Sequence, residues 1–408
     1  MVDGNDGQLK GIYRFFQNTK VTEQKVLETH YLNTIERMQA YRGKIHLLND
    51  TCFVSPSKGM DGLLSRGIGK NNCVRTHYCL AVSEDKKHLF GILNFHSFSG
   101  PLDKKHPDIG NESDIWIKIA ENCINLINAS TQGKKLLSKC IFIADREGDE
   151  YRLLAFLLRN ELSFIIRSQY DRRITFEGEE IKLSDALIDS SKHGRVYSIS
   201  TNKNGVLVNV PVQRSVLRNI LVPVPNKLPK SFNPLEINIV NVSEVTPKEK
   251  PVNWRLLTTE DVSTTSASQL VVNGYSNRWI IEEVNKAAKS GVSVEKRQFT
   301  DIDHYLPFLA MAFVVAWRMV ALRTTVEVSP GTKINEAFTE DEVAYMQAEA
   351  MKKEMKMKNV KDALIFIARL GGYTGRYDRP GWQLLWQGWM KFYERVEGFI
   401  TAKELYSI

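Results

Sequence analysis

Three carboxylates lie at positions in the sequence that suit metal-assisted chemistry. Asp50 and Asp145 each come where an apolar, strand-like run turns polar, in KIHLLNDTCFV and KCIFIADREGDE. Strand ends of this kind often present functional side chains. Glu282 lies in a helix-like segment, GYSNRWIIEEVNKAAKSG. Carboxylate oxygens bind Mg²⁺ or Mn²⁺, and two such ions about 4 Å apart can activate an attacking oxygen in phosphodiester displacement.

The residue types alone leave other interpretations of these carboxylates open. A single aspartate after a strand is often only a cap or a turn residue. The segment DREGDE also contains Glu147 and Asp149, which compete with Asp145 as ligands. Composition therefore does not settle which acid of this segment acts.

The helix-like segment around Glu282 carries an unusual set of side chains. At about 100° per residue, four residues lie within about 60° of one another on a helix. They are Tyr275, Arg278, Glu282 and Lys289. Such a stripe suits a phosphate backbone beside a metal-binding carboxylate. The alternative is a solvated face with an Arg278–Glu282 pair at i,i+4, which spacing alone favours.

Several ordered motifs resemble one protein family. Asp50-Thr51, IADREGDEY, FIIRS and YxxRWxIEExxKxxKSG occur in this order. Together they are similar to the bacterial insertion-sequence transposases of the IS-four and Tn-five type, whose helix signature is Tyr-Arg-Glu-Lys. These belong to the Asp-Asp-Glu class with an RNase-H-like fold. The similarity extends over nearly the whole chain, including YRFFQN, PVNWRLLTTEDV, SVEKRQF and the tail LGGYTGRYDRPGWQLLWQGW.

The resemblance implies a role for each matching residue. Asp50, Asp145 and Glu282 match the catalytic, metal-binding triad, which takes two Mg²⁺ ions or Mn²⁺ as a substitute. Trp254 in VNWRLLT matches a tryptophan that stacks on a flipped base, although a half-buried strand Trp is the ordinary interpretation. The residues implied to contact DNA are Tyr275, Arg278, Lys289, Lys286, Arg167 and Trp254.

The activity implied is cut-and-paste transposition of double-stranded DNA. One triad would nick the transposon end, form and open a hairpin, and join the end to target DNA. The protein would be cytoplasmic in a bacterium and associated with the nucleoid when bound to DNA. The family has a DNA-binding domain ahead of the segment that reads YRFFQN here. The alternative function is therefore an N-terminally shortened, non-catalytic inhibitor that forms mixed dimers with full-length transposase.

The elements that must position these residues predict an α/β fold. We expect an RNase-H-like mixed sheet flanked by helices over residues 1–328, with a β-rich insertion at 170–253. Two strands joined at Ser83–Lys87 form a hairpin signal. Helices are expected at about Ser266–Lys289, with a break near Gly274, and at His304–Thr325.

Residues 329–408 are expected to form a helical C-terminal dimerisation module. Trp382, Trp386 and Trp389 recur there at helical spacing. A stripe facing the chain's own core accounts for this pattern. A small module has little core to cover three tryptophans, however, and the resemblance also implies subunit contacts here, so a homodimer is expected.

Composition sets only broad limits. The net charge of +8 is weak support for a nucleic-acid partner. Five scattered cysteines with no CxxC pair suit reduced thiols rather than disulfides or a zinc site. The N-terminus has no apolar core typical of a signal peptide. The apolar run Tyr305–Leu322 contains Pro307 and Arg318, which favours a buried helix over a membrane span.

Overall fold

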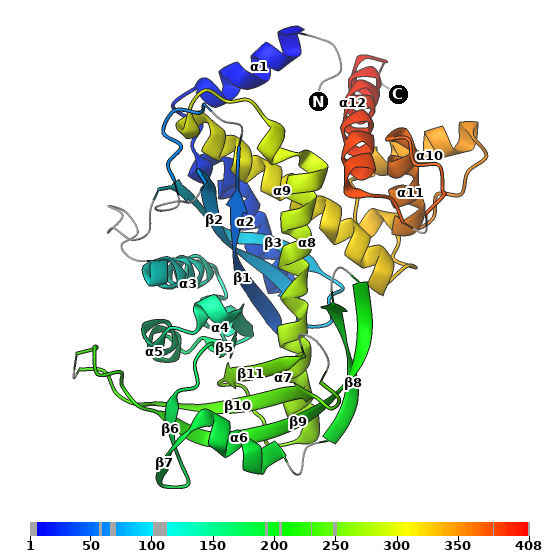
Figure 1. Cartoon of the computed structure of the whole chain (residues 1–408). Coiled ribbons are helices and arrows are strands. Elements are labelled where there is room, and N and C mark those ends of the chain that lie inside the picture. Colours follow the sequence, from blue (N-terminus) through cyan, green and yellow to red (C-terminus); the bar gives the residue numbers. More distant parts are fainter. Residues whose placement is uncertain are drawn as a thin grey trace.

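One mixed sheet of 11 strands runs through most of the chain (Figure 1). The computed structural model describes residues 6–56, 59–65, 71–100, 112–191, 195–203, 206–229, 231–247, 251–377 and 379–406. The strand order is β3-β2-β1-β4-β5-β11-β10-β9-β6-β7, and β8 pairs with β9. The strands are β1 (Ile45–Val54), β2 (Val74–Ser83), β3 (Leu89–Ser99), β4 (Cys140–Ala144), β5 (Ser163–Arg167), β6 (Arg173–Phe176), β7 (Glu179–Lys182), β8 (Arg195–Lys203), β9 (Val206–Val222), β10 (Leu235–Glu244) and β11 (Asn253–Thr258).

The first five strands form the mixed part of the sheet. β1, β2 and β3 are antiparallel neighbours, and the turn between β2 and β3 confirms the hairpin expected at Ser83–Lys87. β1, β4 and β5 are parallel to one another. Every residue of β4 is buried, as its continuous apolar sequence CIFIA predicts for a strand covered on both faces. This arrangement confirms the expected α/β fold with a mixed sheet.

Between residues 170 and 253 the chain forms several strands, and these continue the main sheet. β11 pairs with β5 on one side and with β10 on the other, both antiparallel. β9, β6 and β7 extend the sheet beyond β10. The segment also contains a helix, α6 (Leu183–Ser191), within a sequence that otherwise reads as short strands and turns.

Helices cover both faces of the sheet (Figure 1). α3, α4 and α5 share one buried apolar cluster with the sheet, and α7, α8 and α9 share the cluster on the opposite face. Ile115, Ile119 and Cys123 of α3 recur every four residues along one side of the helix, and all three are buried. The bounds are α1 (Asp6–Gln17), α2 (Glu23–Ala40), α3 (Glu112–Asn128), α4 (Gly133–Leu137), α5 (Tyr151–Arg159), α7 (Thr265–Asn277), α8 (Trp279–Lys286) and α9 (Ile302–Val328).

The helix expected near residues 266–289 is interrupted, but not at Gly274. The break between α7 and α8 comes at Arg278, and the chain then continues as a π-helix, η2 (Ala287–Val292). Gly274 lies inside α7, where an added Cβ would come within 2.8 Å of Ile165 Cδ1. That glycine permits close approach of the helix to the sheet and does not break the helix.

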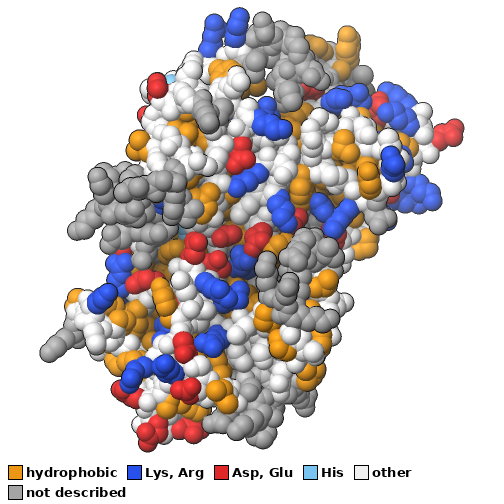
Figure 2. Space-filling model, in the orientation of Figure 1, with side chains coloured by type: hydrophobic (Ala, Val, Ile, Leu, Met, Phe, Trp, Pro, Cys, Tyr) orange, Lys and Arg blue, Asp and Glu red, His pale blue; other side chains and the backbone are white. Residues whose placement is uncertain are grey.

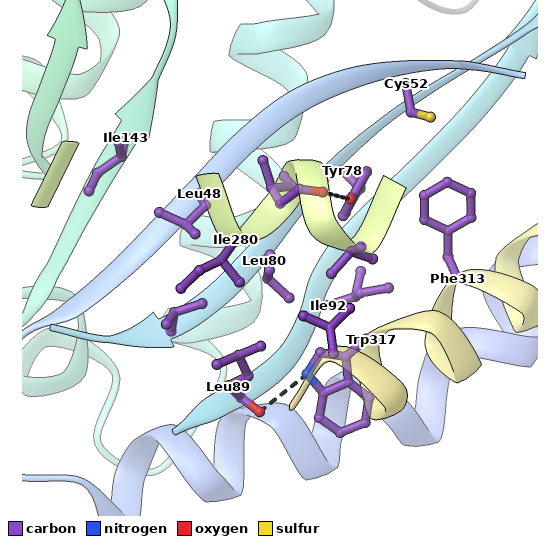
Figure 3. Packing of buried hydrophobic residues seen from close by; sticks show 14 of the residues in the cluster. Leu48, Cys52, Tyr78, Leu80, Leu89, Ile92, Ile143, Ile280, Phe313 and Trp317 are labelled. Carbon is purple, nitrogen blue, oxygen red and sulfur yellow. Dashed lines mark hydrogen bonds between the residues drawn. The ribbon is translucent and has the colours of Figure 1, made fainter. Parts of the chain in front are cut away.

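α9 is long and apolar enough to span a membrane, and it is the one such helix among the described residues. In its most apolar window, 61% is buried inside the protein. Trp317 of this helix donates from Nε1 to the backbone oxygen of Leu89 on β3, at 3.2 Å (Figure 3). Burial and this bond support the interpretation of α9 as a core helix.

The C-terminal region is helical, as predicted, and packs on α9. Its helices share a core with Met319 and Leu322 of α9. α11 and α12 approach each other closely at Gly388, where an added Cβ would overlap the backbone oxygen of Ile367. The elements are η4 (Ile334–Glu336), α10 (Glu340–Lys352), α11 (Val360–Leu370) and α12 (Trp382–Tyr406), and a further short turn, η3 (Val294–Lys296), precedes α9.

Candidate functional site

Asp50 lies where strand pairing on one side of β1 ends. β1 pairs with β4 only as far as Leu48, which is opposite Ile143. Beyond that pair, β1 continues beside β2, with Asp50 directly opposite Tyr78. The Asp50 side chain is 16% exposed, and its Oδ1 accepts from the backbone N–H of Thr51 at 2.9 Å. The end of β4 therefore opens a space beside the sheet into which Asp50 can reach.

Asp145 directly follows β4, at the same end of the parallel strands. Its Oδ1 accepts from the backbone N–H of Glu147 at 2.9 Å and caps the short 3₁₀ helix η1 (Arg146–Gly148). The turn needs a glycine at Gly148, because an added Cβ would come within 2.6 Å of the Ala144 Cβ. The capping interpretation of Asp145 is thus correct, and it leaves the second carboxylate oxygen able to act elsewhere.

Asp149, a rival ligand on sequence grounds, has a structural role. It is 4% exposed and forms an ion pair with Arg172. Its Oδ2 also accepts from the Ser168 hydroxyl at 3.1 Å and from the Gln169 backbone at 2.7 Å. These bonds fasten the loop that carries Asp145 to the end of β5.

Glu282 is brought to the sheet by α8, which packs on β1. Arg278, at the break between α7 and α8, bridges two of the three carboxylates. Its Nη1 lies 3.7 Å from Asp50 Oδ2, and its Nη2 donates to Glu282 Oε1. The i,i+4 pair expected as the alternative is therefore present, and the same guanidinium also contacts Asp50.

The electrostatics link the three acids. Burial raises the pKa of Asp50 to about 7, with further contributions from the charges of Asp145 and Glu282, while Arg278 acts in the opposite direction. Burial disfavours the charged form of Arg278, but neighbouring groups, including Glu282, Asp50 and Asp145, outweigh it and raise its pKa. Crowded carboxylates with a shared cation are typical of a functional site.

The donor chemistry of this cluster fits Mg²⁺ or Mn²⁺, which prefer carboxylate oxygens. In the conformation described here, however, no three His, Cys, Asp or Glu side chains among the described residues stand close enough to hold one ion. Arg278 supplies the positive charge for Asp50 and Glu282 instead. A metal ion could use these ligands only after the guanidinium moved away from them.

Three of the residues expected to contact DNA form a contiguous group beside the triad. Tyr275 is only 5% exposed and contacts Trp254 edge to face, with 5.0 Å between ring centroids. Arg167, at the end of β5, donates to the Asn253 backbone oxygen at 2.9 Å. Burial lowers the pKa of Arg167, and the interaction with Tyr275 partly offsets that effect. Trp254 is half-buried on β11, as its ordinary interpretation predicts. Contact with DNA by this group stays a prediction.

The two lysines of the motif differ in placement. Lys286 is exposed, pairs with Glu283 Oε1 at 2.7 Å and lies over the ring of Trp279 at 4.5 Å. Lys289 lies in the π-helix η2 instead of continuing the α-helical stripe. Burial raises the pKa of Cys52 on β1 to about 12, and the positive charge of Lys289 acts against that rise. The Lys289 ammonium therefore lies near β1.

The surface over this region combines both signs of charge. Figure 2 shows acidic side chains gathered near the centre of the face, with Lys and Arg above and below them. Basic side chains flanking a carboxylate cluster suit a polyanion that passes over the acids.

The three tryptophans expected at a dimer interface are largely covered by their own chain. Trp389 is 4% exposed and belongs to the C-terminal core. Trp382 and Trp386 are half-buried, and Arg323 lies 4.3 Å from the ring of Trp382. Only Trp382 and Trp386 of the three keep exposed surface, so dimerisation through this helix stays a prediction.

Two residues near the triad were missed by sequence reasoning. The Tyr78 hydroxyl reaches from β2 to α8 and donates to Asn285 Oδ1 at 2.8 Å. Tyr78 sits within an apolar strand and Asn285 between motif residues, so neither carried a signal in the sequence.

No protein-family profile matches the chain. One solved structure similar to it is a piggyBac transposase synaptic complex with hairpin DNA, with a TM-score of 0.37 and 11% sequence identity. The match covers 90% of this chain and 59% of that one.

Proposed function

We propose that this chain is the catalytic core of a cut-and-paste DNA transposase of the Asp-Asp-Glu class with the Tyr-Arg-Glu-Lys signature. One observation supports the proposal: Asp50 of β1, Asp145 at the end of the adjacent β4 and Glu282 of α8 lie close enough that the charges of Asp145 and Glu282 act on Asp50. Arg278 contacts Asp50 and Glu282, and the charge of Asp145 acts on Arg278 as well.

The substrate would be double-stranded DNA, at transposon ends and at the target. Water would break a phosphodiester bond at the transposon end and release a 3′ hydroxyl. That hydroxyl would attack a phosphodiester of the opposite strand, which closes a hairpin on the transposon end and releases the flanking DNA. A second water would reopen the hairpin, and the regenerated 3′ hydroxyl would attack a target phosphodiester, so that one target bond breaks as the new joint forms. Two Mg²⁺ ions, or Mn²⁺, would supply Lewis-acid stabilisation of the attacking and leaving oxygens when bound.

The chain's own residues would hold the reactants. Asp50, Asp145 and Glu282 would provide the oxygen ligands. Arg278 would leave the carboxylates for a DNA phosphate, because phosphate oxygens match the planar guanidinium at least as well as a carboxylate does. Arg167 and Lys289 would add phosphate contacts, and the exposed part of Trp254 would stack on an unpaired base.

The test is DNA cleavage in Mn²⁺ on duplexes that carry the terminal repeats flanking the gene. We expect cleavage by the wild-type chain and at least about a 100-fold loss in Asp145→Asn, which is a change of about 3 kcal/mol in the barrier. Glu147→Gln is the matched control, because Glu147 is an exposed acid two residues away. Equal cleavage by Asp145→Asn and the wild type would reject the triad.

A chain that folds and dimerises but never cleaves would point to the alternative, a non-catalytic partner of a full-length transposase. Co-expression with that transposase would then have to lower its transposition frequency. A homodimer through the exposed edges of Trp382 and Trp386 is part of the main proposal, and the measured mass in solution tests it.

A further inference from the structure

Tyr78 joins the strand beside Asp50 to the helix that carries Glu282. It lies directly opposite Asp50 in the β1–β2 pairing and is fully buried. Its hydroxyl donates to the backbone oxygen of Ile281 at 3.1 Å (Figure 3). The same hydrogen is shared with Asn285 Oδ1, which lies 2.8 Å from the hydroxyl oxygen. Ile281 immediately precedes Glu282, and Asn285 follows it by almost one turn. The two bonds therefore bracket the third carboxylate of the site.

α8 is the part of a longer helical run that carries Glu282. It has eight residues, and the backbone stays right-handed helical at Arg278, where α7 ends, and at Ala287, where the π-helix begins. Hydrogen bonds within such a run fix its own conformation but not its rotation or height on the sheet, because these are set by tertiary packing. Its placement on the sheet therefore depends on contacts with the sheet, which are the buried faces of Ile280, Ile281 and Val284 and the Tyr78 hydroxyl.

The phenol itself is held rigidly. Its ring packs edge to face on Phe313 of α9, with 5.2 Å between centroids, and against Phe95 of β3 at 6.0 Å. Burial raises the pKa of Tyr78 well above its ordinary value, and the charges of Cys52, Asp50 and Glu282 add to that rise. The hydroxyl thus stays protonated and donates, close to two acids of the site.

We propose that Tyr78 and Asn285 are positioning residues that fix the rotation and height of α8 on the sheet, so that Glu282 faces Asp50. The proposal rests on the metal site proposed above. Neither residue touches the reacting atoms. They act as the supporting contacts do in other metal sites, where loss of an outer partner weakens metal affinity roughly 10- to 100-fold.

The test compares Tyr78→Phe with Tyr305→Phe in the full chain. Tyr305 is also fully buried, and its hydroxyl also donates to a backbone oxygen, that of Val294, at 3.1 Å. Both variants remove one buried hydroxyl, but only the first removes a bond to α8. We expect Tyr78→Phe to weaken Mn²⁺ binding about tenfold, measured from the free-ion electron paramagnetic resonance signal, while Tyr305→Phe changes it less than about twofold.

Asn285→Ala should also weaken Mn²⁺ binding, but less than Tyr78→Phe, because it leaves the bond from the Tyr78 hydroxyl to Ile281 in place. The double variant should lose less than the two single losses combined, because both single variants remove the bond between Tyr78 and Asn285. Equal Mn²⁺ affinity in Tyr78→Phe and Tyr305→Phe would overturn the proposal. Fully additive losses in Tyr78→Phe and Asn285→Ala would also overturn it.

A second measurement separates this proposal from the metal site itself. Hydrogen exchange of the α8 amides, taken without metal, should speed up in Tyr78→Phe and stay unchanged in Tyr305→Phe. Absence of Mn²⁺ binding by the wild type would reject the metal site. Unchanged α8 exchange in Tyr78→Phe would reject the positioning role, whatever the metal result.

Discussion

At the scale of single residues, Arg278 has two competing sets of partners. It contacts the carboxylates of Asp50 and Glu282, and it belongs to the motif expected to contact phosphate. A guanidinium cannot serve as counter-ion to the acids and leave them free for a metal at the same time. Metal and DNA should therefore bind cooperatively, because a phosphate that attracts Arg278 releases the ligands.

Arg278→Gln should raise the affinity for Mn²⁺ in the absence of DNA about five- to tenfold, since removal of a nearby charge is worth about 1 kcal/mol or more. Lys286→Gln is the control, because Lys286 is a cation on the same helix but pairs with Glu283. Titration of the free-ion signal measures both. Weaker Mn²⁺ binding by Arg278→Gln would show that the arginine supports the site and does not compete for it.

The raised pKa of Asp50 makes stability depend on pH. In the folded chain this pKa is about 7 because of burial and the neighbouring acids Asp145 and Glu282, with Arg278 acting against the rise. The unfolded chain has the ordinary value of about 3.9. Protonated Asp50 therefore makes its full contribution to the free energy of unfolding below about pH 4, and this contribution is lost as the pH rises to about 7.

Asp50→Asn should consequently be more stable than the wild type by roughly 2–4 kcal/mol at pH 8 and about equal at pH 4. Urea unfolding at the two pH values measures the difference. Asp85→Asn is the control with the opposite expected sign. Burial raises the pKa of Asp85, but bonds from Ser83 and Lys87 outweigh burial and lower it, so this variant should be less stable than the wild type at pH 8. Equal stability of Asp50→Asn and the wild type at pH 8 would contradict the prediction.

The motifs predicted Asp50, Asp145 and Glu282 as site residues, but not what surrounds them. The structure brings these acids close enough for the charges of Asp145 and Glu282 to add to the rise that burial gives the pKa of Asp50, while their catalytic role stays a prediction. The choice between Asp145 and Asp149 needed the Arg172 partner, which lies beyond the motif. The Tyr78 bond joins residues about 200 apart in the chain, and no local pattern encodes such a contact.

At the scale of elements, the periodicity of apolar residues predicts where the strands and helices lie, but it does not predict where a helix changes its geometry. A uniform turn of about 100° per residue placed Lys289 on the stripe of Glu282. The π-helix turns the chain less per residue, so that geometry does not extend past Ala287. Gly291 in this π-helix lies against Trp382, where an added Cβ would come within 3.2 Å of the Trp382 Cβ. The contact that accompanies the distortion is therefore distant in sequence.

The close approach of α11 and α12 makes Gly388 sensitive to the smallest substitution. Gly388→Ala would force its Cβ into the backbone oxygen of Ile367 and should cost about 3 kcal/mol of unfolding free energy. Gly398→Ala lies on the same helix with nothing within 4 Å of the added Cβ. It should stabilise by up to about 1 kcal/mol. Urea unfolding of both variants tests the pair, and similar effects would contradict the packing described.

At the scale of the whole molecule, residues on both sides of the boundary expected between 328 and 329 pack into the same apolar cores. The C-terminal core includes Met319 and Leu322 from α9, and Trp382 and Trp386 contact both this core and that of the sheet face. The C-terminal helices therefore complete the packing of the sheet face that α7, α8 and α9 cover, as well as their own core.

A protease site inserted between Pro330 and Gly331 tests this shared packing. After cleavage, the two pieces should stay together through size-exclusion chromatography, because the apolar surface buried between them remains covered. The same cleavage in Trp382→Ala should yield pieces that separate more readily, since this ring contacts both cores. Immediate separation in the wild type would mean that residues 329–408 form an independent domain.

The continuous sheet also affects the order in which a growing chain can fold. β5 pairs with β11, where Ile165 lies opposite Thr258, and the whole β-rich segment is made between them. During synthesis, β5 would leave the ribosome before β11, and its apolar edge would stay unpaired until β11 is made. Long-range pairing of this kind is slow and leaves strand edges open to wrong partners. This waiting period makes the nascent protein a natural client for chaperones, and slower translation before residue 253 would lengthen its exposure.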